Sequence, residues 1–140
     1  MEADPALFTR SETGAGQRNR VSAVIGIVDD DVLVLRALRR LLEGAGFAVK
    51  TFGSAEEFLG LKNPETINCL VVDIHMPGLS GFDLQERLTN ARFPIPIIFI
   101  TANDDASTRE RARKGGVAYF PKPFEPQSLL DAIGKALGGQ

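Results

Sequence analysis

Five short apolar runs alternate with segments of helical spacing along this chain, and this alternation limits the fold more than any other feature. The apolar runs are Val24–Val28, Phe47–Phe52, Cys69–Val72, Ile95–Ile100 and Val117–Phe120. Each run is predicted to form a β-strand. The first, third and fourth runs are apolar at consecutive positions, which is typical of strands buried on both sides of a sheet. The second run alternates more, and we expect it at an edge.

The segments that follow these runs carry apolar residues at helical spacing. The first helix is predicted from a leucine stripe that ends before two glycines: Leu35, Leu38, Leu41 and Leu42, then Gly44 and Gly46. Four more helices are predicted, from Ser54 to Leu61, Gly81 to Asn90, Asp104 to Lys114 and Pro126 to Leu137. Strands that alternate with helices in this way predict an α/β fold, with parallel strands and helices on both faces of the sheet.

Composition places the chain among ordinary soluble globular proteins. Its 140 residues suffice for one domain, and 44% are apolar and 24% charged. A formal charge of −2 gives no electrostatic footprint for nucleic acid, so we expect no direct binding to DNA or RNA by this chain. No apolar run approaches the ~20 residues that cross a bilayer. Because the N-terminus also lacks a signal pattern, we expect a cytoplasmic location without membrane contact.

The N-terminal segment differs from the rest of the chain. Residues 1–20 mix glycine, serine, threonine and scattered charges without an apolar period. They are predicted to be a disordered extension. Residues 21–140 are predicted to form the single domain.

Polar side chains follow four of the five predicted strands. The first strand runs into Asp29 and Asp30, the third ends at Asp73, the fourth at Thr101 and the fifth at Lys122. In an open parallel sheet, ligands bind beyond the carboxyl ends of the strands. We therefore expect these carboxylates, one hydroxyl and one ammonium to meet at one edge of the sheet.

The residue types at this edge favour phosphoryl transfer to a carboxylate. Clustered carboxylates repel one another, so the cluster is predicted to hold a cation. Oxygen ligands without a second cysteine favour Mg²⁺ or Mn²⁺ over zinc or copper. Thr101 and Lys122 suit phosphoryl oxygens, as a hydroxyl donor and a point charge. Asp73 would then be the nucleophile.

Four motifs taken together resemble the bacterial two-component response-regulator receiver domain. They are Val28-Asp29-Asp30-Asp31, Val72-Asp73-Ile74-His75-Met76-Pro77-Gly78 with Gly81, Ile100-Thr101-Ala102, and Tyr119-Phe120-Pro121-Lys122-Pro123-Phe124. Each motif alone is weak, but the set in this order and spacing is highly specific. The sequence is most similar to receivers of nodulation and nitrogen-fixation regulators, over roughly Val24 to Leu137.

The resemblance implies a flavodoxin-like (βα)5 fold with strand order 2-1-3-4-5, and a receiver domain over residues 21–140. It makes Asp73 the phosphorylation site. The implied metal ligands are Asp29, Asp30, Asp73 and the backbone carbonyl of His75, whose ring we expect to point to solvent. Lys122 is implied to contact a phosphoryl oxygen, and the Lys122–Pro123 peptide to be cis.

The resemblance also implies a switch made of Thr101 and Tyr119. The hydroxyl of Thr101 would move to the phosphoryl group, and the ring of Tyr119 would turn inward behind it. The fourth predicted helix has no large apolar side chain, so we expect two alanines to anchor it weakly and the helix to move on phosphorylation. That helix, the fifth strand and the fifth helix would form the face that controls a partner or output domain.

The resemblance implies that a sensor histidine kinase or a histidine phosphotransfer protein supplies the phosphoryl group. The chain would then be a signalling domain and not an enzyme, apart from self-catalysed phosphorylation and dephosphorylation. The alternative is a metal-dependent aspartyl-phosphate phosphohydrolase, but such enzymes of the haloacid-dehalogenase type carry a second aspartate where this chain has His75. The sequence leaves open whether the receiver stands alone or belongs to a longer DNA-binding regulator, and whether it forms a homodimer on phosphorylation.

Overall fold

The computed structural model describes residues 23–138. The N-terminal extension that we predict for residues 1–20 lies outside the described residues, so its disorder stays a prediction. Within the described range, no helix is long and apolar enough to cross a membrane.

The described chain contains one parallel five-stranded sheet in the order β2-β1-β3-β4-β5. The strands are β1 (Val24–Val28), β2 (Ala48–Phe52), β3 (Cys69–Asp73), β4 (Ile97–Thr101) and β5 (Ala118–Pro121). This arrangement confirms the predicted α/β fold and strand order. β2 lies at one edge, as its alternating pattern predicts, whereas β3 and β4 are buried at every position.

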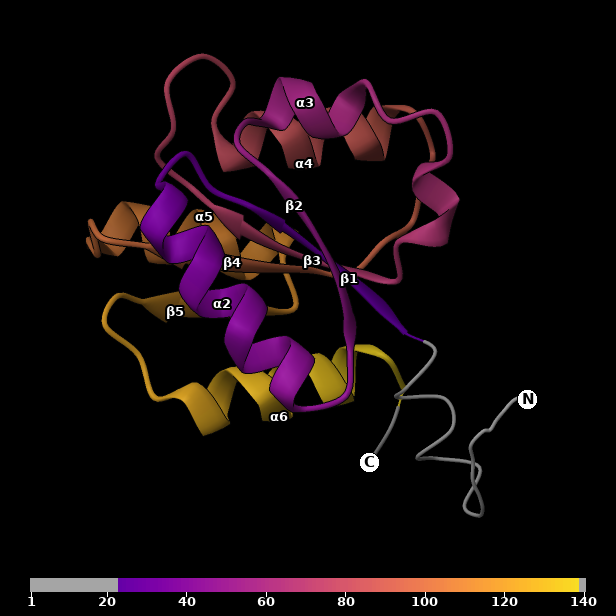
Figure 1. Ribbon diagram of the computed structural model, residues 1–140. Coiled ribbons are helices and arrows are strands. Elements are labelled where there is room, and N and C mark those ends of the chain that lie inside the picture. The colour runs from indigo at the N-terminus through magenta and orange to yellow at the C-terminus, as the bar shows by residue number, and fades with distance from the viewer. Residues whose placement is uncertain (1–22, 139–140) are drawn as a thin grey trace.

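Helices cover both faces of this sheet (Figure 1). They are α2 (Val32–Gly44), α3 (Ala55–Leu59), α4 (Gly81–Asn90), α5 (Ala106–Gly115) and α6 (Pro126–Ala136), with a short 3₁₀ turn, η1 (Pro64–Thr66). The α3 helix is shorter than its predicted range because it ends at Gly60, whose N–H bonds back to the carbonyls of the last turn. Helices α2 and α6 pack on one face, and α3, α4 and α5 pack on the other.

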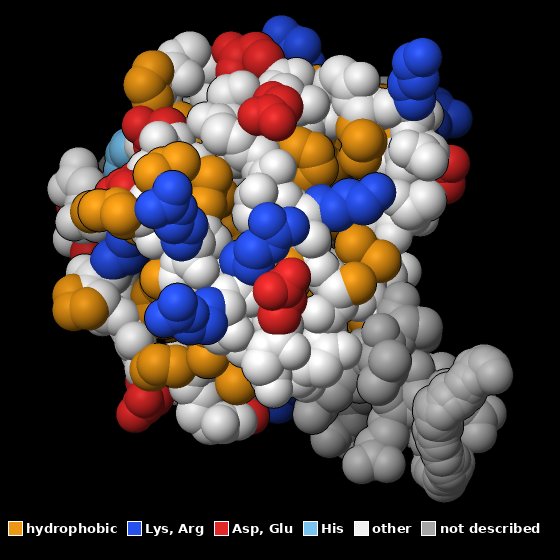
Figure 2. Space-filling model, in the orientation of Figure 1, with side chains coloured by type: hydrophobic (Ala, Val, Ile, Leu, Met, Phe, Trp, Pro, Cys, Tyr) orange, Lys and Arg blue, Asp and Glu red, His pale blue; other side chains and the backbone are white. Residues whose placement is uncertain are grey.

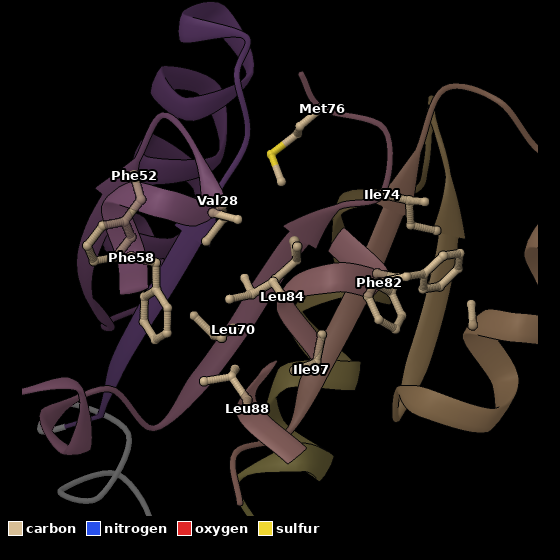
Figure 3. Close-up of a cluster of buried hydrophobic side chains, with 14 of the residues drawn as sticks. Val28, Phe52, Phe58, Leu70, Ile74, Met76, Phe82, Leu84, Leu88 and Ile97 are labelled. Carbon is tan, nitrogen blue, oxygen red and sulfur yellow. The ribbon is translucent and has the colours of Figure 1, made fainter. Parts of the chain in front are cut away.

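The sheet divides the core into two apolar layers. The layer under α3 and α4 is rich in aromatic rings, and Phe58 lies edge-on to Phe52 at a centroid distance of 5.2 Å (Figure 3). The opposite layer packs the leucines of α2 and α6 against β1, β3 and β4. Burial of this many large side chains, at roughly 1.5–3 kcal/mol each, fixes the strand ends that carry the polar residues.

The outer surface of α2 is basic along most of its length but apolar at its first turn (Figure 2). Arg36, Arg39 and Arg40 are exposed there, while Val32 and Leu33 leave 56% and 68% of their surface in solvent. Arg39 also donates a hydrogen bond of 3.1 Å to the carbonyl of Val49 in β2. This contact covers one backbone acceptor on the edge strand.

The buried residues of α5 differ from the two alanines that the sequence predicts. Its buried residues are Thr108 and Ala112, whereas Ala106 is exposed. The prediction that two alanines anchor the helix is therefore confirmed for Ala112 and wrong for Ala106. Residues 106 and 112 are six apart and lie on different sides of a helix, but 108 and 112 are four apart and share one face.

Candidate functional site

Three carboxylates converge where β1 and β3 end. One ligand oxygen each from Asp29, Asp30 and Asp73 lies within 4.8 Å of the others. Asp29 is fully buried and Asp73 is 5% exposed, whereas Asp30 faces solvent. Asp31 has a different role, because its Oδ1 accepts the Leu33 N–H at 2.9 Å and so caps α2. Helix capping therefore accounts for one aspartate of the three consecutive ones and leaves Asp29 and Asp30 to the cluster.

Lys122 reaches this cluster from the end of β5. Its Nζ lies 3.0 Å from Asp29 Oδ2 and 3.8 Å from Asp73 Oδ1. The backbone N–H of Lys122 donates to the Thr101 carbonyl at 2.7 Å, and the Lys122–Pro123 peptide is cis. The ammonium thus offsets part of the negative charge that the sheet edge collects.

The environment of Asp73 raises the pKa of its carboxyl above the ordinary value. Burial, with the negative charge of Asp29 as the second cause, raises the pKa of this carboxyl to about 6, although the Lys122 ammonium acts in the opposite direction. A hydrogen bond from the His75 backbone also lowers the pKa of Asp73. The His75 side chain is exposed.

The loop after β3 is held close to Asp73. A Cβ added to Gly81 would lie 2.7 Å from the Asp73 carbonyl oxygen and 3.0 Å from the Ile74 Cα. The Gly81 N–H donates to the Ile74 carbonyl at 2.9 Å, which fixes the start of α4 beside the strand end. Gly81 is therefore a positioning residue, and its place three residues after the Met76-Pro77-Gly78 motif is the sequence signal that indicates it.

Thr101 is fully buried at the end of β4. Its Oγ1 accepts the Asn103 N–H at 3.0 Å and lies 3.4 Å from the Asn103 carbonyl oxygen. The hydroxyl is thus engaged with the loop that leads to α5. The structure places Thr101 on the strand beside Asp73, with Ile100 in register with Asp73 itself.

Tyr119 lies on β5 in register with Phe99 and packs, half-buried, against the aromatic layer. Its hydroxyl donates a 2.6 Å hydrogen bond to Asp104 Oδ1. Arg109 pairs with the same oxygen at 3.3 Å. Sequence reasoning missed Asp104, because it lies in the loop after β4, its partner lies on β5, and no local pattern predicts their contact.

The carboxylate oxygens of this site suit a hard divalent cation, and Lys122 and the Thr101 hydroxyl lie at the same sheet edge. A strand end that carries an acidic cluster and a lysine, on a (βα)5 sheet of this order, defines the receiver class of protein. The sequence model described as "Response regulator receiver domain" matches residues 25–134. The chain belongs to this family, which confirms the resemblance drawn from the motifs.

Individual relatives share this assignment. The chain is 45% identical over 112 residues to Nodulation protein W of Bradyrhizobium diazoefficiens, covering 79% of this chain and 49% of that protein. It is 41% identical to the response regulator protein TodT of Pseudomonas putida over 127 residues, covering 90% of this chain and 56% of TodT. The chain thus spans about half the length of these curated relatives.

Solved structures agree with the fold. The response regulator StyR superposes with a TM-score of 0.77 at 49% identity, over 84% of this chain and 60% of StyR. The structure titled FixJ-N has a TM-score of 0.75 at 36% identity, over 84% of this chain and 95% of that one. The likeness to FixJ and to a nodulation protein confirms the predicted similarity to nodulation and nitrogen-fixation regulators.

Proposed function

We propose that this chain is a phosphorylation switch in which Asp73 accepts the phosphoryl group. The observation that carries the proposal is the convergence of Asp73 with two other carboxylates and the Lys122 ammonium at one sheet edge. The phosphoryl group would bring more negative charge to this edge than the carboxylate that it replaces, and the Lys122 ammonium 3.8 Å from Asp73 is placed to offset part of that charge. The signalling family of the domain supports this reading over an aspartyl-phosphate phosphohydrolase, which no contact of the site favours.

The proposed donor is a phosphohistidine on a sensor histidine kinase or a histidine phosphotransfer protein. An oxygen of the Asp73 carboxylate forms a bond to phosphorus while the phosphorus–nitrogen bond of the donor breaks. The electron pair of that bond stays on the imidazole nitrogen, which takes up a proton. Lys122 stabilises the oxygens of the transferring group by charge.

Asp29, Asp30, Asp73 and the His75 carbonyl would hold Mg²⁺ or Mn²⁺. The acidic cluster supports this assignment, because the single Lys122 ammonium offsets only part of the charge of three carboxylates within 4.8 Å of one another. A bound divalent cation would neutralise charge on the phosphoryl oxygens during transfer. Asp29 is already paired with Lys122, so Asp30 and Asp73 are the carboxylates best placed to give their oxygens to the ion.

The signal is proposed to leave through Thr101 and Tyr119. Both lie on the sheet face that α5 covers, because Thr101 follows Phe99 by two residues and Phe99 pairs with Tyr119. A cleft of about 260 Å³ lies between α5 and β5, and Tyr119, Val117 and Arg109 are among its lining residues. Turning the Tyr119 ring would therefore change the α5–β5–α6 face that a partner, an output domain or a second copy of the chain would meet.

The proposed setting is cytoplasmic, with no direct contact to nucleic acid by this chain. Incubation with acetyl phosphate and Mg²⁺, followed by intact-mass measurement, tests the central proposal. We expect the wild-type mass to rise by one phosphoryl group and that of Asp73→Asn to stay unchanged. Equal phosphorylation of both proteins would show that Asp73 is not the acceptor.

A further inference from the structure

Asp104 is the carboxylate that holds the Tyr119 hydroxyl. The two oxygens are 2.6 Å apart, a short distance typical of a charge-assisted hydrogen bond. Arg109, on the first turn of α5, lies 3.3 Å from the same Asp104 oxygen. The loop after β4, the hydroxyl on β5 and the start of α5 therefore meet at a single carboxylate.

The same loop is fastened to Thr101. Asn103 donates its backbone N–H to the Thr101 hydroxyl at 3.0 Å, and Asp104 is the next residue in the chain. Only residues 102–105 separate the end of β4 from the start of α5. If the Thr101 hydroxyl turns to a phosphoryl group, the Asn103 N–H loses its acceptor. The Asn103 carbonyl, 3.4 Å from the same hydroxyl, loses its donor, and the Asn103–Asp104 peptide that contains this carbonyl is free to shift.

We propose that Asp104 is a positioning residue that latches Tyr119 outward in the unphosphorylated protein, and that the Asn103–Asp104 peptide transmits the movement of Thr101 to this latch. The inference rests on the proposed function, because it assigns the link between the two proposed switch residues. The link passes through a short covalent loop rather than through packing alone. It also makes release of the Tyr119 hydroxyl a condition for changing the shape of the cleft that this ring lines.

Arg109 gives the latch its second connection. It pairs with Asp104 and lines the cleft together with Tyr119. Release of Asp104 from the hydroxyl therefore changes two walls of the cleft at once, one on β5 and one on α5. The buried residues of α5 are Thr108 and Ala112. With so few buried side chains, little packing resists a movement of this helix.

The single tyrosine gives a direct readout in this chain, which contains no tryptophan. Acrylamide quenching of tyrosine emission is measured on the unphosphorylated wild type, Asp104→Ala, Asp104→Asn and Asp131→Ala. Asp131 is an exposed aspartate of α6 that accepts from Gln127, so its variant controls for the loss of one charge. We expect Asp104→Ala to be quenched less than wild type because its ring turns inward. Asp104→Asn, which keeps an oxygen acceptor, should fall between them, and Asp131→Ala should match wild type.

Phosphorylation by acetyl phosphate supplies the second readout. Loss of a latch that opposes the phosphorylated state should raise the phosphorylation rate, by up to about tenfold, the factor that corresponds to 1.4 kcal/mol. Tyr119→Phe should raise the rate similarly, and adding Asp104→Ala to it should produce no further increase. Unchanged quenching in Asp104→Ala would contradict the proposed role of Asp104. Additive effects of Asp104→Ala and Tyr119→Phe on the phosphorylation rate would contradict it as well. If the wild type accepts no phosphoryl group, the proposed function is contradicted instead. The quenching comparison still tests whether Asp104 holds the Tyr119 ring outward.

Discussion

The Lys122 ammonium lies 3.0 Å from the carboxylate of Asp29, a side chain with no exposed surface. The two residues are 93 positions apart, so the contact joins the end of the first strand to the end of the last. A buried carboxylate without a cationic or hydrogen-bonding partner is strongly unfavourable. The ion pair thus stabilises the buried Asp29 carboxylate in the protein without a bound metal or phosphoryl group.

Removing this ammonium should be costly. Lys122→Met leaves the buried Asp29 without its nearest cation, so we expect the free energy of unfolding to fall by about 2–4 kcal/mol. Lys114→Met, at an exposed position of α5, serves as the matched control and should change stability by less than about 0.5 kcal/mol. Urea unfolding measures both. Equal stability of the two variants would contradict a structural role for the ion pair.

The pKa of Asp73, raised by burial to about 6, predicts the sign of a pH effect. The folded protein binds this proton more tightly than the unfolded chain, so stability should fall as pH rises from about 4 to about 6 and then level off. Asp73→Asn removes this contribution and should gain roughly 1–3 kcal/mol over wild type above that range in metal-free buffer. Chemical unfolding at several pH values tests this. A stability difference between the two proteins that does not change with pH would disprove it.

Divalent cation should stabilise the folded protein through the acidic cluster. At one hundred times its dissociation constant, a ligand specific for the folded state adds about 2.7 kcal/mol. We expect Mg²⁺ to raise the melting temperature of wild type, and to do so much less for Asp30→Asn. Asp31→Asn keeps the side-chain oxygen that caps α2 and should retain the response. Loss of the response in both variants would show a general charge effect and not a site.

Gly81 should tolerate no side chain. A Cβ there would meet the Asp73 carbonyl oxygen at 2.7 Å, so Gly81→Ala must move the backbone at the acceptor. We expect a loss of about 1–3 kcal/mol and slower phosphorylation by acetyl phosphate. Gly134→Ala is the control, since nothing lies within 4 Å of its Cβ position in α6, and it should gain about 0.5–1 kcal/mol. The prediction fails if Gly81→Ala is phosphorylated at the wild-type rate.

The α5 helix should open more readily than α2. Its buried residues are Thr108 and Ala112, whereas α2 buries three leucines. Hydrogen exchange should therefore show amides of α5 exchanging roughly tenfold or more faster than those of α2 at the same pH, with the difference growing on phosphorylation. Equal protection of the two helices would show that other contacts hold α5 in place.

The fold was predictable because its strong signals are local. The consecutive apolar residues of Val24–Val28 and Cys69–Val72 identify buried strands, and the polar residues directly after them identify the edge at which they meet. Strand order followed from the resemblance, since the alternation of strands and helices alone fits several orders of a parallel sheet.

The contacts that were missed depend on tertiary geometry. Nothing in the local sequence around Asp104, a loop residue, indicates that its partner is Tyr119, fifteen residues away on β5. The anchoring face of α5 was misjudged for a related reason. Composition shows which small residues the helix has, but only the packed structure shows that Thr108, and not Ala106, turns inward.

The three consecutive aspartates between β1 and α2 have three different structural roles. Asp29 is buried against Lys122, Asp30 is exposed beside Asp73, and Asp31 is the N-cap of α2. The chain has no spare residue at this junction, so chemically identical side chains are not interchangeable. Inserting or deleting one residue there would keep an acidic sequence. It would nevertheless move each carboxylate away from the position where it pairs with the lysine, lies beside Asp73 or caps the helix.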